Sequence, residues 1–283
     1  MYRRSEDCRQ RVLVVAGLDG CEQGPSLGLG DLIRVITLLP AIKADQLDWC
    51  SPPQLFALAK DCPCVCKTLD SRVLAQVVDD YDFVLNLTFV QLNNTTADVL
   101  EISDVLGGKS RIKERTYDLP RLLSERLSLV YTGNLPFVSV PTSSDFDIGF
   151  NWCVPLDWQT KELPQSTWIE LEEILSSRFT ISWQTEGSDL EEYIGWVRGC
   201  KLLVSIVGLG CHLSMFYGRQ LLMLSAPTDF SEVHHYCDAR VMYPANTCKD
   251  RPCYRKFGEE HCPCMAHFRA VDIAEAATNM LDS

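Results

Sequence analysis

Residues 11–36 read RVLVVAGLDGCEQGPSLGLGDLIRVI, and this stretch decides the fold. Its first part, residues 11–16, is a short and continuous apolar run rich in valine, which is typical of a buried parallel strand. A loop rich in glycine follows, and from Leu32 onward the apolar residues recur at helical spacing. A strand, a glycine turn and a helix in this order predict the first unit of an open α/β sheet, where ligands bind at the carboxyl ends of the strands.

Asp31 stands at the start of this predicted helix. Free backbone N–H groups and the helix dipole stabilise a carboxylate there in its ionised form, in which it can accept a proton. The alternative is that Asp31 only caps the helix, because acidic residues are common at helix starts. On this stretch alone, Asp31 is therefore a candidate base and a candidate cap.

The second half of the chain shows the same order of strand, turn and helix at two places. Residues 151–155 predict a strand that leads into a polar loop with Lys161, and helical spacing of apolar residues follows from Trp168. Residues 201–207 predict another strand, followed by a turn with Gly208 and Gly210 and by a further helix. Backbone N–H groups at such a helix start bind phosphate, so this turn is a candidate phosphate site.

The composition excludes several classes of protein. The 283 residues, 46% of them hydrophobic, suffice for two cores of ordinary size. A net charge of −12 argues against nucleic acid as a partner, because its phosphates would be repelled. No apolar run approaches the roughly 18 residues of a membrane-spanning helix. The short apolar stretch near the start lacks a small-residue cleavage site, so we expect a cytoplasmic protein, with peripheral membrane contact left open.

The fourteen cysteines fall largely into two groups. Alternation in residues 62–66 would place three of them on one face of a strand, where free cysteine packs as a small apolar residue. The C-terminal loop, residues 237–264, carries enough thiolates for a structural zinc or iron ion, and reduced thiols or disulfides are the alternatives. The candidate metal ligands are Cys248, Cys253, Cys262 and Cys264.

A polar linker, residues 141–145, separates the chain into two halves, 1–145 and 146–283. In both halves, apolar runs of strand length alternate with helical patterns, which predicts two Rossmann-like α/β domains. The amphipathic segment 270–281 predicts a last helix. The predicted strands lie near residues 12–17, 47–50, 64–68, 82–89 and 137–140, and then near 150–154, 179–183, 201–207 and 221–225.

Taken together, these motifs resemble glycosyltransferase family 9, the lipopolysaccharide heptosyltransferases. The resemblance rests on GLGDLIRVITLLPAIK at 28–43, on YDFVLNL at 81–87 and on KELPQSTW at 161–168. It continues through 204–212, 227–229 and the cysteine-bearing loop, and so covers nearly the whole chain. It implies a GT-B fold, in which two Rossmann-like domains face each other across a cleft and the C-terminal helix crosses back to the first domain.

The resemblance also implies a function. It implies an inverting, metal-independent glycosyltransferase that moves heptose from ADP-heptose to an acceptor hydroxyl on a glycan, a small molecule or a protein. The first domain would bind the acceptor and the second the nucleotide sugar, with no cofactor for catalysis. Asp31 would be the base and Lys161 the partner of the diphosphate. The donor would contact Gly30, Gly208, Gly210, Cys211, His212, Thr228 and Asp229.

One departure from the family pattern matters for the donor. The family's strand ends V-S-x-D-[ST]-G-x-x-H, whereas this chain has Val207 at the aspartate position and Leu209 at the glycine position. The missing carboxylate leaves the identity of the donor open. It also supports an alternative function, that of a catalytically silent GT-B protein that binds a nucleotide sugar or acts as a scaffold.

Overall fold

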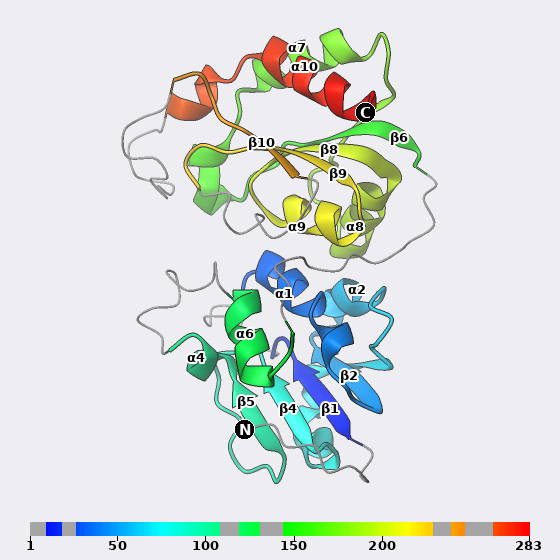
Figure 1. Ribbon diagram of the computed structural model, residues 1–283, viewed down its shortest axis with the longest axis vertical. Helices are drawn as coiled ribbons and strands as arrows, with labels where there is room; N and C mark the ends of the chain where they lie inside the picture. Colours follow the sequence, from blue (N-terminus) through cyan, green and yellow to red (C-terminus); the bar gives the residue numbers. More distant parts are fainter. Residues whose placement is uncertain (1–9, 19–26, 108–118, 131–143, 229–238, 247–262) are drawn as a thin grey trace. The chain divides into compact units, whose positions relative to one another are not determined.

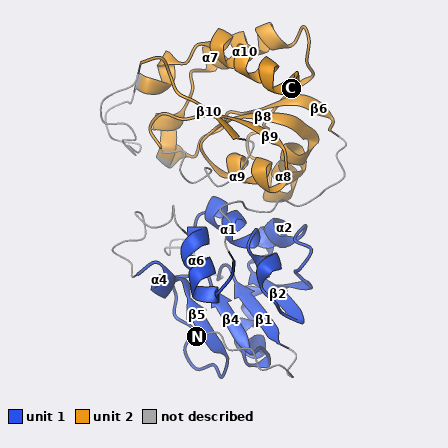
Figure 2. Cartoon of the chain, in the orientation of Figure 1, with its two compact units in different colours: residues 1–138 blue, residues 139–283 orange. Residues whose placement is uncertain are grey.

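The computed structural model describes residues 10–18, 27–107, 119–130, 144–228, 239–246 and 263–283. The chain divides into two compact units, residues 1–138 and 139–283 (Figure 2). Each unit is built on a five-stranded sheet in which every neighbouring pair of strands is parallel (Figure 1). The predicted α/β class with two parallel sheets is therefore confirmed.

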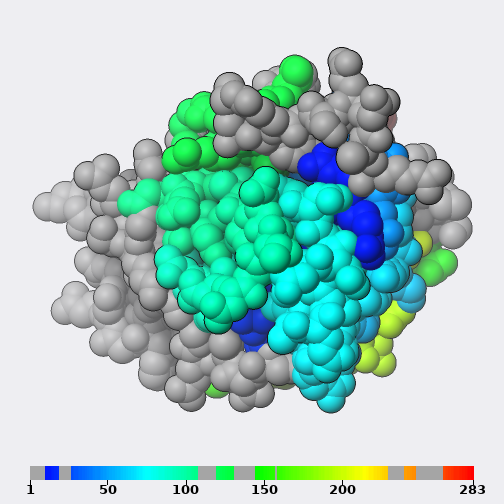
Figure 3. Space-filling model, turned by 90° about the horizontal axis from the view of Figure 1, so that it is seen from below, coloured from blue at the N-terminus to red at the C-terminus, as the bar shows by residue number. Residues whose placement is uncertain are grey.

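The sheet of the first unit has the strand order β3-β2-β1-β4-β5. Its central strand is the valine-rich run of the opening motif, and residues 12–15 of that strand are fully buried, as expected for a strand covered on both faces. In Figure 3, the cyan and teal segments that include β4 and β5 lie side by side on one face. The strands are β1 (Arg11–Val15), β2 (Gln46–Ser51), β3 (Lys67–Asp70), β4 (Phe83–Asn86) and β5 (Asp98–Glu101).

Short helices connect these strands, and α1 packs against α2 and α6. The α-helices are α1 (Leu29–Ile36), α2 (Phe56–Ala59), α3 (Leu74–Val77), α4 (Ile102–Val105) and α6 (Leu119–Leu127). Single 3₁₀ turns cover Leu39–Ala41, Pro53–Leu55, Ser71–Val73 and Val78–Asp80.

The predicted strand at 64–68 is wrong in its position, and so is the prediction that the cysteines of residues 62–66 share one face of a strand. The strand begins only at Lys67, and residues 61–66 form a turn. Pro63 has no backbone N–H to donate to a sheet, and the Val65 N–H bonds back to the Cys62 carbonyl at 3.1 Å. The three cysteines of this turn therefore do not share one face of a strand. Edge strand β5 was not predicted, and the predicted strand at 137–140 lies outside the described residues.

The second unit has the strand order β10-β9-β8-β6-β7. Four strands are expected here and present, but β6 begins at Phe146, four residues before the predicted 150–154, and the added edge strand is β10. The strands are β6 (Phe146–Asn151), β7 (Ile181–Trp183), β8 (Cys200–Ile206), β9 (Gln220–Leu224) and β10 (Ala239–Met242). The helices are α7 (Gln165–Leu175), α8 (Leu190–Gly199), α9 (Leu209–Phe216) and α10 (Ala270–Leu281), with 3₁₀ segments at Leu156–Lys161 and Pro263–His267.

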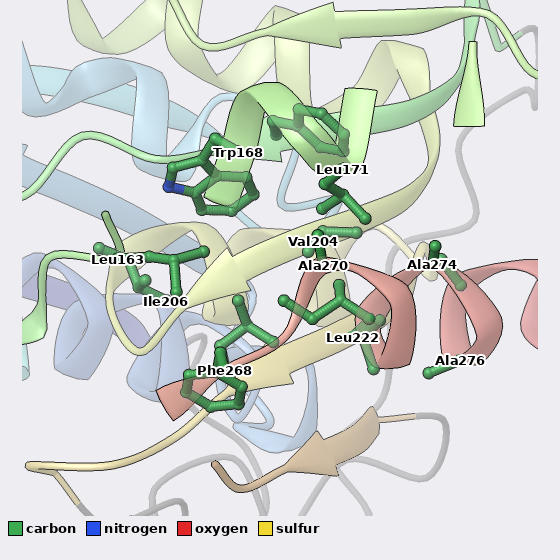
Figure 4. Close-up of a cluster of buried hydrophobic side chains, with 14 of the residues drawn as sticks. Leu163, Trp168, Leu171, Val204, Ile206, Leu222, Phe268, Ala270, Ala274 and Ala276 are labelled. Carbon is green, nitrogen blue, oxygen red and sulfur yellow. The ribbon is translucent and has the colours of Figure 1, made fainter. Parts of the chain in front are cut away.

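Helices cover both faces of this second sheet. Figure 1 shows α7 and α10 on one face and α8 and α9 on the other. Beneath α7 and α10 lies a buried core that joins Trp168 and Leu171 of α7 to Val204 and Leu222 of the sheet (Figure 4). The alanines of α10 contribute to the same core and let that helix approach the sheet closely.

The last helix was predicted at 270–281, and the structure confirms its bounds. Its buried face packs against α7, β8 and β9, all within the second unit. That packing accounts for the amphipathic pattern, and the crossing back to the first domain stays a prediction. No helix in the described ranges combines the length and the apolar character needed to cross a bilayer.

Leu171→Ala should destabilise the second unit by about 2–5 kcal/mol, because Leu171 is fully buried and its removal leaves a cavity. Ile169→Ala in the same helix is the matched control, since Ile169 is 46% exposed and its loss should cost under about 0.5 kcal/mol. Urea unfolding followed by tryptophan fluorescence measures both, because five of the six tryptophans lie in residues 139–283. Equal losses for the two variants would contradict this core.

Candidate functional site

Asp31 lies in the first turn of α1, at the carboxyl end of β1. It is the third residue of the helix, and the cap position belongs to Gly28. Its Oδ2 atom accepts a hydrogen bond from the Gly28 backbone N–H at 3.2 Å. The Asp31 side chain is 19% exposed, so its carboxylate is reachable from solvent while being held by the helix start. Gly30 precedes it within the same turn.

Arg34 is a partner of Asp31 that the sequence reasoning missed. Its side chain is fully buried, and its guanidinium donates a hydrogen bond to Asp31 Oδ1, which forms an ion pair one turn apart on α1. A buried charge is costly unless it is paired, so this carboxylate stabilises the arginine within an otherwise apolar helix. The signal in the sequence was the single arginine among the apolar residues 32–36, three positions after an aspartate.

Lys161 ends the 3₁₀ segment that follows β6. Its Nζ atom donates to the backbone carbonyl of Val207 at 3.2 Å, and the same ammonium lies 4.2 Å from the centre of the Trp158 ring. The structure thus brings Lys161 to the carboxyl end of β8, immediately before Gly208. These residues are 46 positions apart in sequence, so the contact is a product of the fold.

A buried polar network lies beneath the start of α9. Tyr193 donates to Asn151 Oδ1 at 2.8 Å, and Asn151 Nδ2 donates to Ser205 Oγ at 2.6 Å. Ser205 in turn donates to the Ile206 carbonyl at 2.7 Å. Burial raises the pKa of Tyr193, which keeps its hydroxyl protonated as a donor. The network joins α8, β6 and β8, and no sequence motif signalled it beyond two polar residues at strand ends.

Gly210 is required by this network. A Cβ atom at position 210 would lie 2.5 Å from Asn151 Nδ2 and 2.6 Å from the Tyr193 hydroxyl oxygen. Position 208 is open, with nothing within 4 Å of an added Cβ. The two glycines of the turn therefore differ. Gly210 lets α9 approach the network, whereas Gly208 leaves open space at the start of α9.

The remaining predicted donor residues of the second unit lie on α9 or after β9. Cys211 and His212 are buried in the first turns of α9, with 3% of His212 exposed. Thr228 follows β9, and its carbonyl accepts from Ser225 Oγ at 2.8 Å. Because β6, β8 and β9 are neighbouring parallel strands, Lys161, Gly208 and Thr228 follow the same edge of the sheet. Asp229 lies outside the described residues.

The predicted metal ligands cannot be brought together from the described residues. Cys248, Cys253 and Cys262 lie outside them, and Cys264 is buried in the core of the second unit. Within the parts of the chain that the structure describes, no three or more His, Cys, Asp or Glu side chains are placed to hold a metal ion. The metal centre therefore stays a prediction.

Comparison with known proteins gives matches by structure but none by sequence. No protein-family model matches the chain, and no curated protein is significantly similar to it. The glycosyl transferase family 9 structure from Veillonella parvula has a TM-score of 0.68 at 14% identity, covering 99% of this chain and 100% of its own. E. coli heptosyltransferase WaaC with ADP-2-deoxy-2-fluoro heptose has a TM-score of 0.59 at 15% identity, covering 97% and 100%.

The chain has the fold of these glycosyltransferase structures. A third match is the iron-containing dodecameric glycosyltransferase TibC from enterotoxigenic E. coli, with a TM-score of 0.60 at 10% identity, covering 96% of this chain and 76% of that one. The resemblance inferred from the sequence motifs is thus confirmed for the fold, along nearly the whole chain. In this fold, the segments that follow β1, β6, β8 and β9 carry the described candidate residues.

Gly210→Ala should destabilise the second unit by about 1–3 kcal/mol, because the new methyl group overlaps a buried and hydrogen-bonded network. Gly195→Ala is the matched control, since Gly195 lies inside α8 with open space around it. Alanine there should stabilise by up to about 1 kcal/mol through helix propensity. Urea unfolding compares the two variants, and changes of the same sign would rule out the close approach at Gly210.

Proposed function

We propose that this protein is an inverting, metal-independent heptosyltransferase that transfers a sugar from ADP-heptose to an acceptor hydroxyl. Two features support the proposal: the fold, and the position of Lys161 at the phosphate-type turn of the second unit. The second feature carries it, because a lysine held by the carbonyl of Val207 places a cation beside a helix start that suits a diphosphate. We assign the donor to the second unit and the acceptor to the first.

In this reaction the acceptor oxygen forms a bond to the anomeric carbon of the sugar while the bond from that carbon to the diphosphate breaks. Asp31 takes the proton of the acceptor hydroxyl, and ADP leaves from the opposite face, which inverts the anomeric centre. Lys161 offsets the negative charge that develops on the leaving diphosphate, the role that a divalent ion has in other transferases. Backbone N–H groups of residues 209–212 bind the phosphates at the α9 start.

Arg34 contributes indirectly to this proposal. Its guanidinium fixes one oxygen of Asp31, while the Gly28 N–H fixes the other. A base held at both oxygens keeps its orientation, and this lowers the entropic cost of reaching the transition state. The acceptor is a glycan, a small molecule or a protein. The net charge of −12 disfavours an acceptor carried on a strongly anionic lipid.

A second candidate function is a silent protein of the same fold that binds a nucleotide sugar without transferring it. Val207 favours this candidate, since the family has a carboxylate at that position. Asp31 and Lys161 argue against it. The two functions differ in one observation: an enzyme releases ADP in the presence of an acceptor, and a silent binder does not.

Asp31→Asn should lower turnover by about 100-fold or more and leave the affinity for ADP-heptose nearly unchanged, because an amide oxygen still accepts hydrogen bonds but takes up no proton. ADP release measures turnover, and calorimetry measures donor binding. Asp82→Asn is the control: Asp82 accepts from the Arg11 backbone N–H at 2.8 Å, at the start of β1. Wild-type turnover in Asp31→Asn would remove Asp31 from the mechanism.

Lys161→Ala should weaken ADP-heptose binding and also lower turnover, because the ammonium contacts phosphate in the ground state and more strongly in the transition state. Lys201→Ala is the matched control, since Lys201 pairs with Asp147 at the start of β8, away from the carboxyl edge. Calorimetry with ADP and with ADP-heptose measures both variants. If the lysine variants behave alike, another cation holds the diphosphate.

We further propose a structural zinc or iron ion on Cys248, Cys253, Cys262 and Cys264. Elemental analysis of protein purified without added metal should find about one equivalent per chain, and Cys253→Ser should lose it together with thermal stability, because metal binding is coupled to folding. Cys153→Ser, in a thiol outside the loop, is the control. Metal-free protein with four freely titratable thiols would end this proposal and leave the transferase proposal standing.

A further inference from the structure

The turn at residues 61–66 joins α2 to β3 and carries a cysteine at every second position. Hydrogen bonds of the backbone fix both ends of the turn. The Cys62 N–H donates to the Ala59 carbonyl at 3.0 Å, and the Cys66 N–H donates to the Leu47 carbonyl at 2.7 Å. The turn is thus held against α2 and β2, and its cysteines have defined positions.

Two of the three thiols face each other. The Sγ atoms of Cys62 and Cys64 lie 3.3 Å apart, within a hydrogen bond between two free thiols. The sulfurs would have to approach to about 2.05 Å to form a disulfide, a movement of little more than one ångström. Cys66 is exposed and directs its own thiol toward the Cys64 carbonyl at 4.0 Å.

The environments of the paired thiols are unequal. The hydrogen bond from Cys64 lowers the pKa of the Cys62 thiol, because it stabilises the thiolate. The same bond, followed by burial, raises the pKa of the Cys64 thiol. Cys62 is buried and Cys64 is half-buried, so a small molecule meets Cys64 first, although the raised pKa of Cys64 slows its attack, and the Cys62 thiol stands behind it. This is an arrangement of an entry thiol and a resolving thiol.

We propose that Cys62 and Cys64 form a dithiol site that undergoes reversible exchange with small-molecule disulfides. A disulfide RSSR exchanges with Cys64, which gives a mixed disulfide and one RSH. The Cys62 sulfur then attacks the Cys64 sulfur, the bond to R breaks, and a second RSH leaves with the remaining proton. The dithiol is oxidised to one disulfide while RSSR is reduced to two RSH, and a dithiol reductant reverses the process.

A hydrogen bond links the site to helix α1. The Cys62 thiol donates to the carbonyl of Ile36, the last residue of α1, at a sulfur–oxygen distance of 3.9 Å. Oxidation removes the S–H proton and therefore this hydrogen bond. Helix α1, which carries Asp31, ends at Ile36. Its last carbonyl therefore keeps the hydrogen bond from Cys62 only while Cys62 is a thiol. The dithiol itself does not depend on the proposed transferase activity.

Trypsin gives a direct test, because Lys60 and Lys67 release residues 61–67 as one peptide with three of the fourteen cysteines. The full-length protein is treated with oxidised glutathione, alkylated with iodoacetamide and digested. We expect the peptide to contain a Cys62–Cys64 disulfide located by fragment ions, with either an alkyl group or glutathione on the exposed Cys66. Treatment with dithiothreitol before alkylation should return three alkylated cysteines.

Two variants test the assigned roles. Cys62→Ser should trap glutathione on Cys64 as a stable mixed disulfide, since the resolving thiol is absent. Cys66→Ser should still form the disulfide, because the exposed thiol is not part of the pair. Three alkylated cysteines after oxidation, a Cys64–Cys66 link, or glutathione retained on Cys64 of the wild-type protein would each overturn the proposal.

Discussion

The carboxyl edge of the second sheet depends on the hydrogen-bonded chain from Tyr193 through Asn151 to Ser205. Asn151 and Ser205 are paired in register on neighbouring strands β6 and β8, so their side chains meet on one face of the sheet. Each of these polar groups is buried, and leaving one without its partner would cost about 1–3 kcal/mol. The network therefore fixes where β6 and β8 end, and with them the turn that follows each strand.

In the first unit, the ion pair between Arg34 and Asp31 has the structural role that the hydrogen-bonded network has in the second. Arg34 is a buried charge in the core of this unit, and its ion pair with Asp31 offsets the cost of burying it. The same carboxylate is the proposed base, so one group serves both the stability of α1 and the chemistry. A substitution of Asp31 therefore affects both the stability of α1 and the proposed chemistry. Measuring binding and folding on the same variant separates the two effects.

The sequence predicts those elements whose pattern lies within one short stretch of the chain. A valine run, a glycine turn and apolar residues at helical spacing lie within 26 consecutive positions, and they predicted β1 and α1. The edge strands β5 and β10 were missed, and neither contains a buried residue. The network at Asn151 was missed because its partners lie 42 and 54 positions away. Local periodicity carries no information about such contacts, nor about the burial of Arg34.

The hydrogen bond of Lys161 to the end of β8 goes to a main-chain oxygen, that of Val207. Every amino acid supplies the same carbonyl, so the residue at position 207 can change without removing the acceptor that positions the cation. The family's aspartate and this chain's valine are equivalent in that respect. A sequence comparison scores only side chains. It therefore counts Val207 as a lost aspartate, although the main-chain carbonyl that positions Lys161 is still present.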